Sequence, residues 1–265
     1  VNYTASGICH SDYSFANGVL PTQLPAVLGH EGAGIVEEVG ANVTNVKVGD
    51  HIVAALTPSC GKCTFCLESK PFLCAEMSSV IWEGCLLDGT KRFKNSKGED
   101  IGQLVSVGTF SERSVIPAGM AIKVDDKAPL DTICLIGCGV TTGVGAALNT
   151  VDIKEGDSCA VIGCGGVGLS IIQGCRIAGA GQIIAIDPVA EKRELALSMG
   201  ATIAIDPTDI NIVKEIRKVS KGGVHFAFEA LGLKVTIEQA WAMPRVTGTA
   251  VIVGVPKMDT ELELP

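Results

Sequence analysis

The chain has 265 residues and a formal net charge of -8. This acidic balance gives no attraction to nucleic acid or to an anionic membrane surface, so we expect the partner to be a small molecule. Eleven cysteines spread over so long a chain favour a reducing cytoplasm over the disulfide scaffold of a short secreted protein, and we expect a cytoplasmic protein.

The first half of the chain has the pattern of a β-rich domain. Short apolar segments at residues 34–39 and 51–56 alternate with turn signals such as Gly49-Asp50. We place this first domain at residues 1–145.

One stretch invites a membrane interpretation. Residues 133–151 carry no charge and are long enough to span a bilayer. The stretch also holds four glycines, three threonines and one asparagine, which favour turns and buried packing. We therefore expect no membrane span.

The pattern changes at about residue 156, where β-branched apolar runs begin to alternate with helical stretches. This alternation is typical of a parallel sheet built from βαβ units. We expect strands at 158–163, 183–187, 202–206, 225–231 and 249–255, and helices at 167–178, 191–199, 211–219 and 235–242. The fold class is therefore mixed, a β-rich domain followed by an α/β doubly wound domain at residues 146–265.

The chain begins with Val1 and supplies five strands where the usual doubly wound sheet has six. We therefore expect it to be part of a longer protein, cut at both ends.

Four cysteines lie within fifteen positions, at Cys60, Cys63, Cys66 and Cys74. Two intervening residues let both sulfurs of a Cys-x-x-Cys pair reach one zinc ion at about 2.3 Å. Four protein ligands leave no open coordination position, so we expect this ion to brace a loop rather than take part in chemistry.

The segment that follows the first strand of the second domain reads Gly-Cys-Gly-Gly-Val-Gly and opens a helix. In this G-x-G-x-x-G pattern the glycines permit a tight turn, close approach of a pyrophosphate and packing of helix against strand. The predicted cofactor-binding glycines are Gly163, Gly165, Gly166 and Gly168.

Asp187 ends the second expected strand, about 20 residues after the turn. A carboxylate at this place holds the ribose hydroxyls of NAD and repels the 2′-phosphate of NADP, so the pattern predicts a Rossmann domain that binds NAD. Lys192, one helical turn further, is a candidate for contact with the ribose or a phosphate. The alternative is a glycine-rich turn with an unrelated aspartate and a solvated lysine.

Three dispersed segments carry further ligand types: residues 9–12 with a cysteine, a histidine and an aspartate, residues 29–32 with His30 and Glu31, and Cys138 between two glycines. Zinc held by three protein ligands keeps a fourth position open and polarises a substrate oxygen. Spacing alone does not join residues so far apart, and a lone Cys or His is more often a buried structural group.

These segments together resemble one known family. The strings Gly-Ile-Cys-His-Ser-Asp at 7–12, Gly-His-Glu-Gly-Ala-Gly at 29–34 and Gly-Cys-Gly-Val-Thr-Thr-Gly at 137–143, with the cysteine loop and the glycine turn, resemble the zinc-containing medium-chain alcohol dehydrogenases. The resemblance runs from end to end of the chain. It implies a GroES-like catalytic domain, a Rossmann domain, two zinc ions per subunit, NAD as cofactor and, at full length, a homo-oligomer, either dimer or tetramer.

The resemblance also implies two ligand sets. Cys9, His30 and Cys138 match the ligands of a catalytic zinc, and the four loop cysteines match those of a structural zinc. Asp12 matches a carboxylate that orients the histidine ligand without touching the metal.

Five further residues receive roles from the resemblance. Ser11 matches the hydroxyl that takes the alcohol proton, and Glu31 matches a carboxylate behind the zinc. His10 matches a residue that contacts the cofactor pyrophosphate, while Thr142 and Val167 match residues that pack near the nicotinamide.

Two features depart from the family pattern. Many relatives pass the proton on to a histidine five residues after the cysteine ligand, where this chain has Ser14. Leu56 and Leu104 stand where several relatives place phenylalanine, which implies a pocket with room for bulky or branched alcohols.

The sequence therefore predicts a zinc-dependent, NAD-linked dehydrogenase that interconverts a primary alcohol, medium-sized or aromatic, and its aldehyde. A rival of the same class is a formaldehyde dehydrogenase that oxidises the S-hydroxymethyl adduct of a thiol, with which His10 is compatible. A rival of another class is a zinc- and nucleotide-binding module without turnover. The presence of all three dispersed ligands favours the enzyme.

Overall fold

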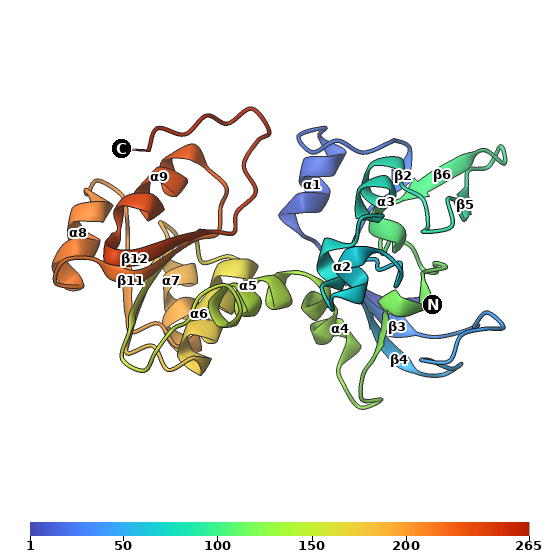
Figure 1. The fold of residues 1–265 in the computed structure, drawn as a ribbon, viewed down its shortest axis with the longest axis horizontal. Coiled ribbons are helices and arrows are strands. Elements are labelled where there is room, and N and C mark those ends of the chain that lie inside the picture. Colours follow the sequence, from blue (N-terminus) through green and yellow to red (C-terminus); the bar gives the residue numbers. More distant parts are fainter. Residues whose placement is uncertain (265) are drawn as a thin grey trace. The chain divides into compact units, whose positions relative to one another are not determined.

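The computed structural model describes residues 1–264, without the side chains of residues 78, 79 and 81. The chain divides into two units, Val1–Cys138 and Gly139–Pro265 (Figure 1). The boundary expected between residues 145 and 146 falls inside helix α5 (Gly139–Leu148), which belongs to the second unit.

Two small sheets form the framework of the first unit. One is antiparallel, with the strand order β1 (Asn2–Gly7), β3 (Glu31–Ile35), β4 (His51–Ala54) and β7 (Ala121–Lys123). The other has the order β2 (Ala26–Val27), β6 (Asp100–Gln103) and β5 (Phe93–Lys94). The predicted β-rich character is confirmed, although β3 starts and ends before the expected 34–39, because residues 37–40 are exposed and irregular.

The helices of this unit are short. The α-helices are α1 (His10–Ala16), α2 (Thr64–Leu67), α3 (Met77–Glu83) and α4 (Leu130–Ile133). The 3-10 helices are η1 (Pro71–Leu73), η2 (Leu104–Ser106), η3 (Ala118–Met120) and η4 (Cys134–Gly137). Helices of one or two turns gain little from propensity, so their positions depend on packing and, at the cysteine loop, on ligands.

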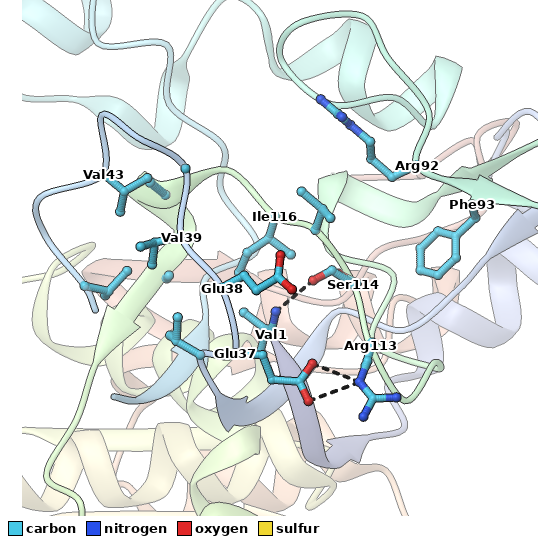
Figure 2. A pocket seen from close by; sticks show the side chains of 16 residues that line it. Val1, Glu37, Glu38, Val39, Val43, Arg92, Phe93, Arg113, Ser114 and Ile116 are labelled. Carbon is cyan, nitrogen blue, oxygen red and sulfur yellow. Dashed lines mark hydrogen bonds and ion pairs between the residues drawn. The ribbon is translucent and has the colours of Figure 1, made fainter. Parts of the chain in front are cut away.

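A cavity of about 370 Å³ lies at one side of the first unit, among valines and the side chains of Arg92 and Arg113 (Figure 2). Arg113 Nε donates to the Glu37 carboxylate at 2.8 Å, and the Val1 ammonium donates to the Ser114 carbonyl at 3.0 Å. None of the predicted site residues lines this cavity, so it is not a candidate active site.

The second unit is a five-stranded parallel sheet. Its strand order is β10 (Ile203–Ile205), β9 (Gln182–Ile186), β8 (Ser158–Ile162), β11 (Val224–Glu229) and β12 (Pro244–Ile252). The connecting helices are α6 (Gly166–Ile177), α7 (Ala190–Met199), α8 (Ile212–Val219) and α9 (Lys234–Ala242). This is the strand order of a doubly wound dinucleotide-binding fold, so the predicted fold class is confirmed.

Alternate residues of the central strand face opposite layers. Cys159 and Val161 of β8 pack with α5, α6 and α7, while Ala160 and Ile162 pack with α8 and α9. Burial on both faces explains the continuous apolar runs of the sequence. The expected helices and strands of this unit begin and end within two residues of those observed, except β12, which spans Pro244–Ile252 rather than 249–255.

Among the described residues no single helix is long and apolar enough to cross a bilayer. One bent pair of helical segments passes the test of length and composition, Leu130–Gly137 followed by Gly139–Leu148.

Candidate metal centres and cofactor turn

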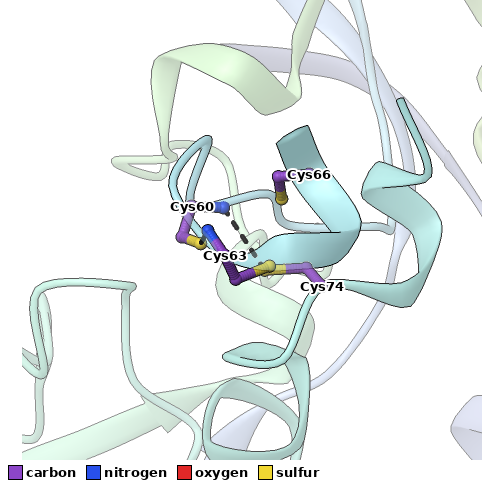
Figure 3. Close-up of side chains that lie close together, drawn as sticks. All are labelled: Cys60, Cys63, Cys66 and Cys74. Atoms are coloured by element: carbon purple, nitrogen blue, oxygen red, sulfur yellow. Dashed lines mark hydrogen bonds between the residues drawn. The ribbon is translucent and has the colours of Figure 1, made fainter. Parts of the chain in front are cut away.

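The four loop cysteines come together at one point. Cys63 precedes α2, Cys74 follows η1, and the four sulfurs all lie within 4.8 Å of one another (Figure 3). The Cys60 N–H donates to the Cys74 sulfur at 3.3 Å, and the Cys63 N–H donates to the Cys60 sulfur at 3.4 Å. Four sulfurs so close together, with amide donors among them, fit a tetrahedral zinc ion.

Backbone donors make two of these thiols acidic. The N–H groups of Ala75 and Cys66 lower the pKa of Cys63 to about 6, and those of Lys62 and Cys63 lower the pKa of Cys60. Removal of the Cys66 thiol from water disfavours its charged form and raises its pKa to about 11. A bound divalent cation favours the thiolate form of every ligand, so the amides and the ion act in the same direction on Cys60 and Cys63.

The dispersed ligand candidates also meet. Ligand atoms of Cys9, His30, Glu31 and Cys138 all lie within 4.8 Å of one another. Cys9 lies at the N-terminal cap of α1, His30 directly before β3, and Cys138 directly after η4. Two sulfurs, one imidazole and one carboxylate are ligand types that zinc accepts.

One buried carboxylate holds two of these ligand segments in place. Asp12, which is 2% exposed, accepts hydrogen bonds at Oδ1 from the Gly29 N–H at 3.0 Å and pairs there with His30 Nδ1 at 2.9 Å. Its Oδ2 accepts the Cys9 N–H at 3.1 Å. Because Nδ1 is directed at Asp12, Nε2 is the ring atom that can serve as a metal ligand.

Charges within the dispersed cluster stabilise one another. Hydrogen bonds from Cys138, His30 and Ser11 outweigh burial and lower the pKa of the Cys9 thiol to about 4. Burial disfavours a charged imidazole, yet hydrogen bonds with Asp12 and Cys9 raise the pKa of His30 to about 10. A thiolate beside an imidazolium is what such a ligand set adopts when protons take the place of a divalent cation.

The two other residues predicted to take part in catalysis lie at this cluster. Ser11 directs its hydroxyl and its backbone N–H at the Cys9 sulfur. Glu31 is 4% exposed, and a side chain at Gly7 would overlap its carboxylate, so the glycine leaves the space that Glu31 needs. Their roles in proton transfer and behind the metal stay predictions.

The glycine turn joins β8 to α6. Gly163 donates its N–H to the Ile186 carbonyl at 2.9 Å, and a side chain at Gly168 would overlap the Gly163 carbonyl. Gly165 and Gly166 are exposed at the N-terminus of α6, and the first amide groups of a helix have no partner within it. An N-terminus of this kind binds anions, so the turn suits a pyrophosphate.

Asp187 follows β9 and is 4% exposed. Its Oδ2 accepts the Cys164 N–H of the glycine turn at 2.9 Å, and its Oδ1 accepts the Val189 N–H at 2.9 Å. Each oxygen can accept a further hydrogen bond, so both remain able to hold ribose hydroxyls. Lys192 is exposed on α7.

The remaining predicted residues lie apart from these hydrogen bonds. His10 is exposed and meets the Tyr13 ring edge-on at 5.8 Å, Thr142 is exposed on α5, and Val167 is half-buried on α6. Their contacts with the cofactor stay predictions. Leu104 is 1% exposed in the core of the first unit, and Leu56 packs half-buried against the same core, so the roomy pocket stays a prediction.

Two residues of interest escaped the sequence reasoning. Arg193 donates to the Asp187 carbonyl at 2.7 Å and pairs with Asp206 at 3.0 Å. Glu229 is fully buried at the end of β11. The sequence does offer one sign of Glu229, which is a carboxylate in a strand expected to be buried on both faces. Such a group must find hydrogen-bond donors.

Comparison with known proteins agrees with this arrangement. Residues 1–126 match the alcohol dehydrogenase GroES-like domain, and residues 166–265 match the family described as zinc-binding dehydrogenase. The chain belongs to the zinc-containing alcohol dehydrogenases. The family resemblance predicted from the motifs is therefore confirmed.

Three relatives of this dehydrogenase illustrate the similarity. S-(hydroxymethyl)glutathione dehydrogenase of Saccharomyces cerevisiae is 44% identical over 99% of this chain and 69% of its own length. A relative from Mycobacterium tuberculosis is 47% identical over 77% of this chain and 55% of its own length. The crystal structure of benzyl alcohol dehydrogenase from Acinetobacter calcoaceticus superposes with a TM-score of 0.91 at 33% identity, over all of this chain and 72% of that one. The chain thus spans between about half and three quarters of these proteins, and its location and subunit number stay predictions.

Proposed function

We propose that this dehydrogenase catalyses the reversible oxidation of a primary alcohol, medium-sized or aromatic, to its aldehyde, with NAD as the hydride acceptor. One observation carries the proposal: ligand atoms of Cys9, His30, Glu31 and Cys138 lie within 4.8 Å of one another. Zinc bound there would supply a Lewis acid that polarises the substrate oxygen, which is the group that loses a proton when an alcohol is oxidised. A module without turnover has no need of this second ligand set.

The chain's own residues supply orientation and proton transfer. Asp12 fixes the His30 ring and the backbone of the Cys9 and Gly29 segments. The Ser11 hydroxyl, which lies at the Cys9 sulfur, receives the alcohol proton. Because Ser14 stands where many relatives have a histidine, the proton leaves Ser11 by way of water or another base.

The second unit supplies the cofactor site. The amide groups at the N-terminus of α6, around Gly165 and Gly166, hold the pyrophosphate, and the Asp187 carboxylate holds the ribose hydroxyls. A carboxylate 4% exposed and already bonded to two amides cannot move aside for a 2′-phosphate, so the chain selects NAD over NADP.

The decisive experiment is a substrate screen of the zinc-loaded enzyme that follows reduced cofactor by absorbance. We expect turnover of benzyl alcohol and other primary alcohols with NAD, little with NADP, and about two zinc ions per chain. A clear preference for NADP would refute the role given to Asp187. A protein with a single tightly held zinc ion and no turnover would be the binding module instead.

A second candidate substrate is the S-hydroxymethyl adduct of a thiol. The observation that favours it is the 44% identity to the yeast S-(hydroxymethyl)glutathione dehydrogenase over 99% of this chain. Comparing kcat/KM for benzyl alcohol and for S-hydroxymethylglutathione separates the two candidates. If only the adduct reacts, the first choice of substrate is wrong while the zinc and NAD chemistry stands.

A further inference from the structure

Glu229 is a buried carboxylate that the proposed chemistry does not use. It ends β11, its residue is 0% exposed, and no ion pair involves it among residues 1–264. A carboxylate in such a place needs hydrogen-bond donors to offset the loss of water.

The loop between β11 and α9 provides these donors. Glu229 Oε1 accepts the Leu231 N–H at 2.9 Å, the Gly232 N–H at 2.9 Å and the Thr236 hydroxyl at 2.7 Å. Oε2 accepts the Gly232 N–H at 3.1 Å. Since Thr236 lies in the first turn of α9, the positive end of that helix also favours the charge. The loop is therefore folded around one carboxylate.

The same loop lies directly against the glycine turn. The Ala230 N–H donates to the carbonyl of Ile162, the last residue of β8, at 3.0 Å. A Cβ atom at Gly163 would lie 2.7 Å from the Leu231 Cγ, so Leu231 packs on the first glycine of the turn. Leu231 nevertheless remains 45% exposed. It is thus an apolar wall that stands open beside the predicted pyrophosphate site.

We propose that Glu229 is a positioning residue for NAD. By holding the amides of Leu231 and Gly232, it keeps this wall seated on the glycine turn and so sets the affinity for the cofactor. The inference rests on the proposed function, because it needs NAD at this turn. Glu229 acts through the loop and not by contact with the cofactor.

The test measures the Kd for NAD of the zinc-loaded enzyme by calorimetry, together with KM and kcat, for wild type and Glu229→Gln. Glutamine has the size of glutamate but presents an NH₂ group to one of the loop donors. We expect Kd and KM for NAD to rise about tenfold, while kcat at saturating NAD changes by less than about twofold. Glu238→Gln is the matched control and should leave Kd unchanged, because this half-buried carboxylate of the same helix pairs with Lys234 and accepts the Glu263 N–H, away from the Glu229 loop amides.

Three results would overturn the inference. Glu229→Gln with wild-type affinity but a lower melting temperature would show a structural role alone. If that variant does not fold, Leu231→Ala at the exposed wall replaces it, and unchanged affinity for NAD in this variant would count equally against the proposal. A wild-type enzyme that does not bind NAD at all would remove the proposed function and the inference with it.

Discussion

The two candidate metal centres are built in opposite ways. The cysteine loop takes its four ligands from fifteen consecutive residues, and the helices between them, α2 and η1, span four and three residues. The dispersed centre draws Cys9, His30 and Cys138 from three separate elements and ties two of them to one aspartate. We therefore expect the loop to depend on a bound ion for its shape, whereas the hydrogen bonds of Asp12 already hold two ligand segments of the dispersed site in place.

Because of this difference, we expect the loop centre to contribute mainly to stability and the dispersed centre mainly to catalysis. A loop of short helices has few apolar contacts of its own, so metal binding and local folding are coupled. The dispersed site is preorganised by β3, α1 and the buried Asp12, so we expect an ion there to exchange without unfolding of its surroundings. Substitutions in the two centres should therefore have different readouts.

The largest effect is expected from Cys138→Ser in the dispersed centre. Loss of one of three ligands should reduce kcat/KM at least about 1,000-fold, because the Lewis acid is lost or misplaced. The free energy of unfolding should fall by no more than about 1 kcal/mol, since the sheet and Asp12 still hold the other ligands. Steady-state kinetics and urea unfolding measure the two quantities on one preparation. If the free energy of unfolding of this variant fell by several kcal/mol, the dispersed centre would also be needed for stability, and the two centres would not differ as argued.

The reverse pattern is expected for Cys74→Ser in the loop. The free energy of unfolding should fall by about 4 kcal/mol, as for other losses of a structural metal, and the zinc content should drop by one ion per chain. Molecules that remain folded should keep most of their kcat. Cys85→Ser, at another buried cysteine outside both ligand sets, is the control and should retain both ions.

The same contrast explains what the sequence could predict. Spacing alone predicts the loop, because all its ligands are local. The doubly wound order was likewise predictable, since β-branched runs and helical stretches alternate from Ser158 onward. Cys9, His30 and Cys138 share no local pattern, and only the family resemblance connects them. The bonds from Asp12 to the Cys9 and Gly29 amides depend on tertiary packing, as does the enclosure of Glu229, so neither was visible in the sequence.

An intermediate effect is expected from Asp12→Asn. The amide can accept hydrogen bonds with only one of its two groups, so either His30 or the Cys9 backbone loses its partner. Zinc affinity of the dispersed centre should fall about 10- to 100-fold, and excess zinc should restore much of the activity. Competition with a chelator measures this loss, while the loop ion should be released at the wild-type rate. If the chelator removed both zinc ions faster by the same factor, Asp12 would stabilise the whole unit rather than one site.

The smallest effect, and the finest test of the comparison, is expected from Gly61→Ala. Gly61 has a φ of +70°, no atom lies within 4 Å of the place where a Cβ would stand, and its N–H is directed at the Cys66 sulfur. Alanine there meets only the backbone penalty of the left-handed conformation, about 1 kcal/mol. Gly29, beside His30, has a φ of +87°, but a Cβ there would lie 2.6 Å from the Phe110 backbone nitrogen, so Gly29→Ala must also displace the neighbouring chain. Urea unfolding of the two variants should therefore show a larger loss at Gly29. If both variants lost the same free energy of unfolding, the packing around the dispersed centre would accommodate a new side chain as easily as the loop does.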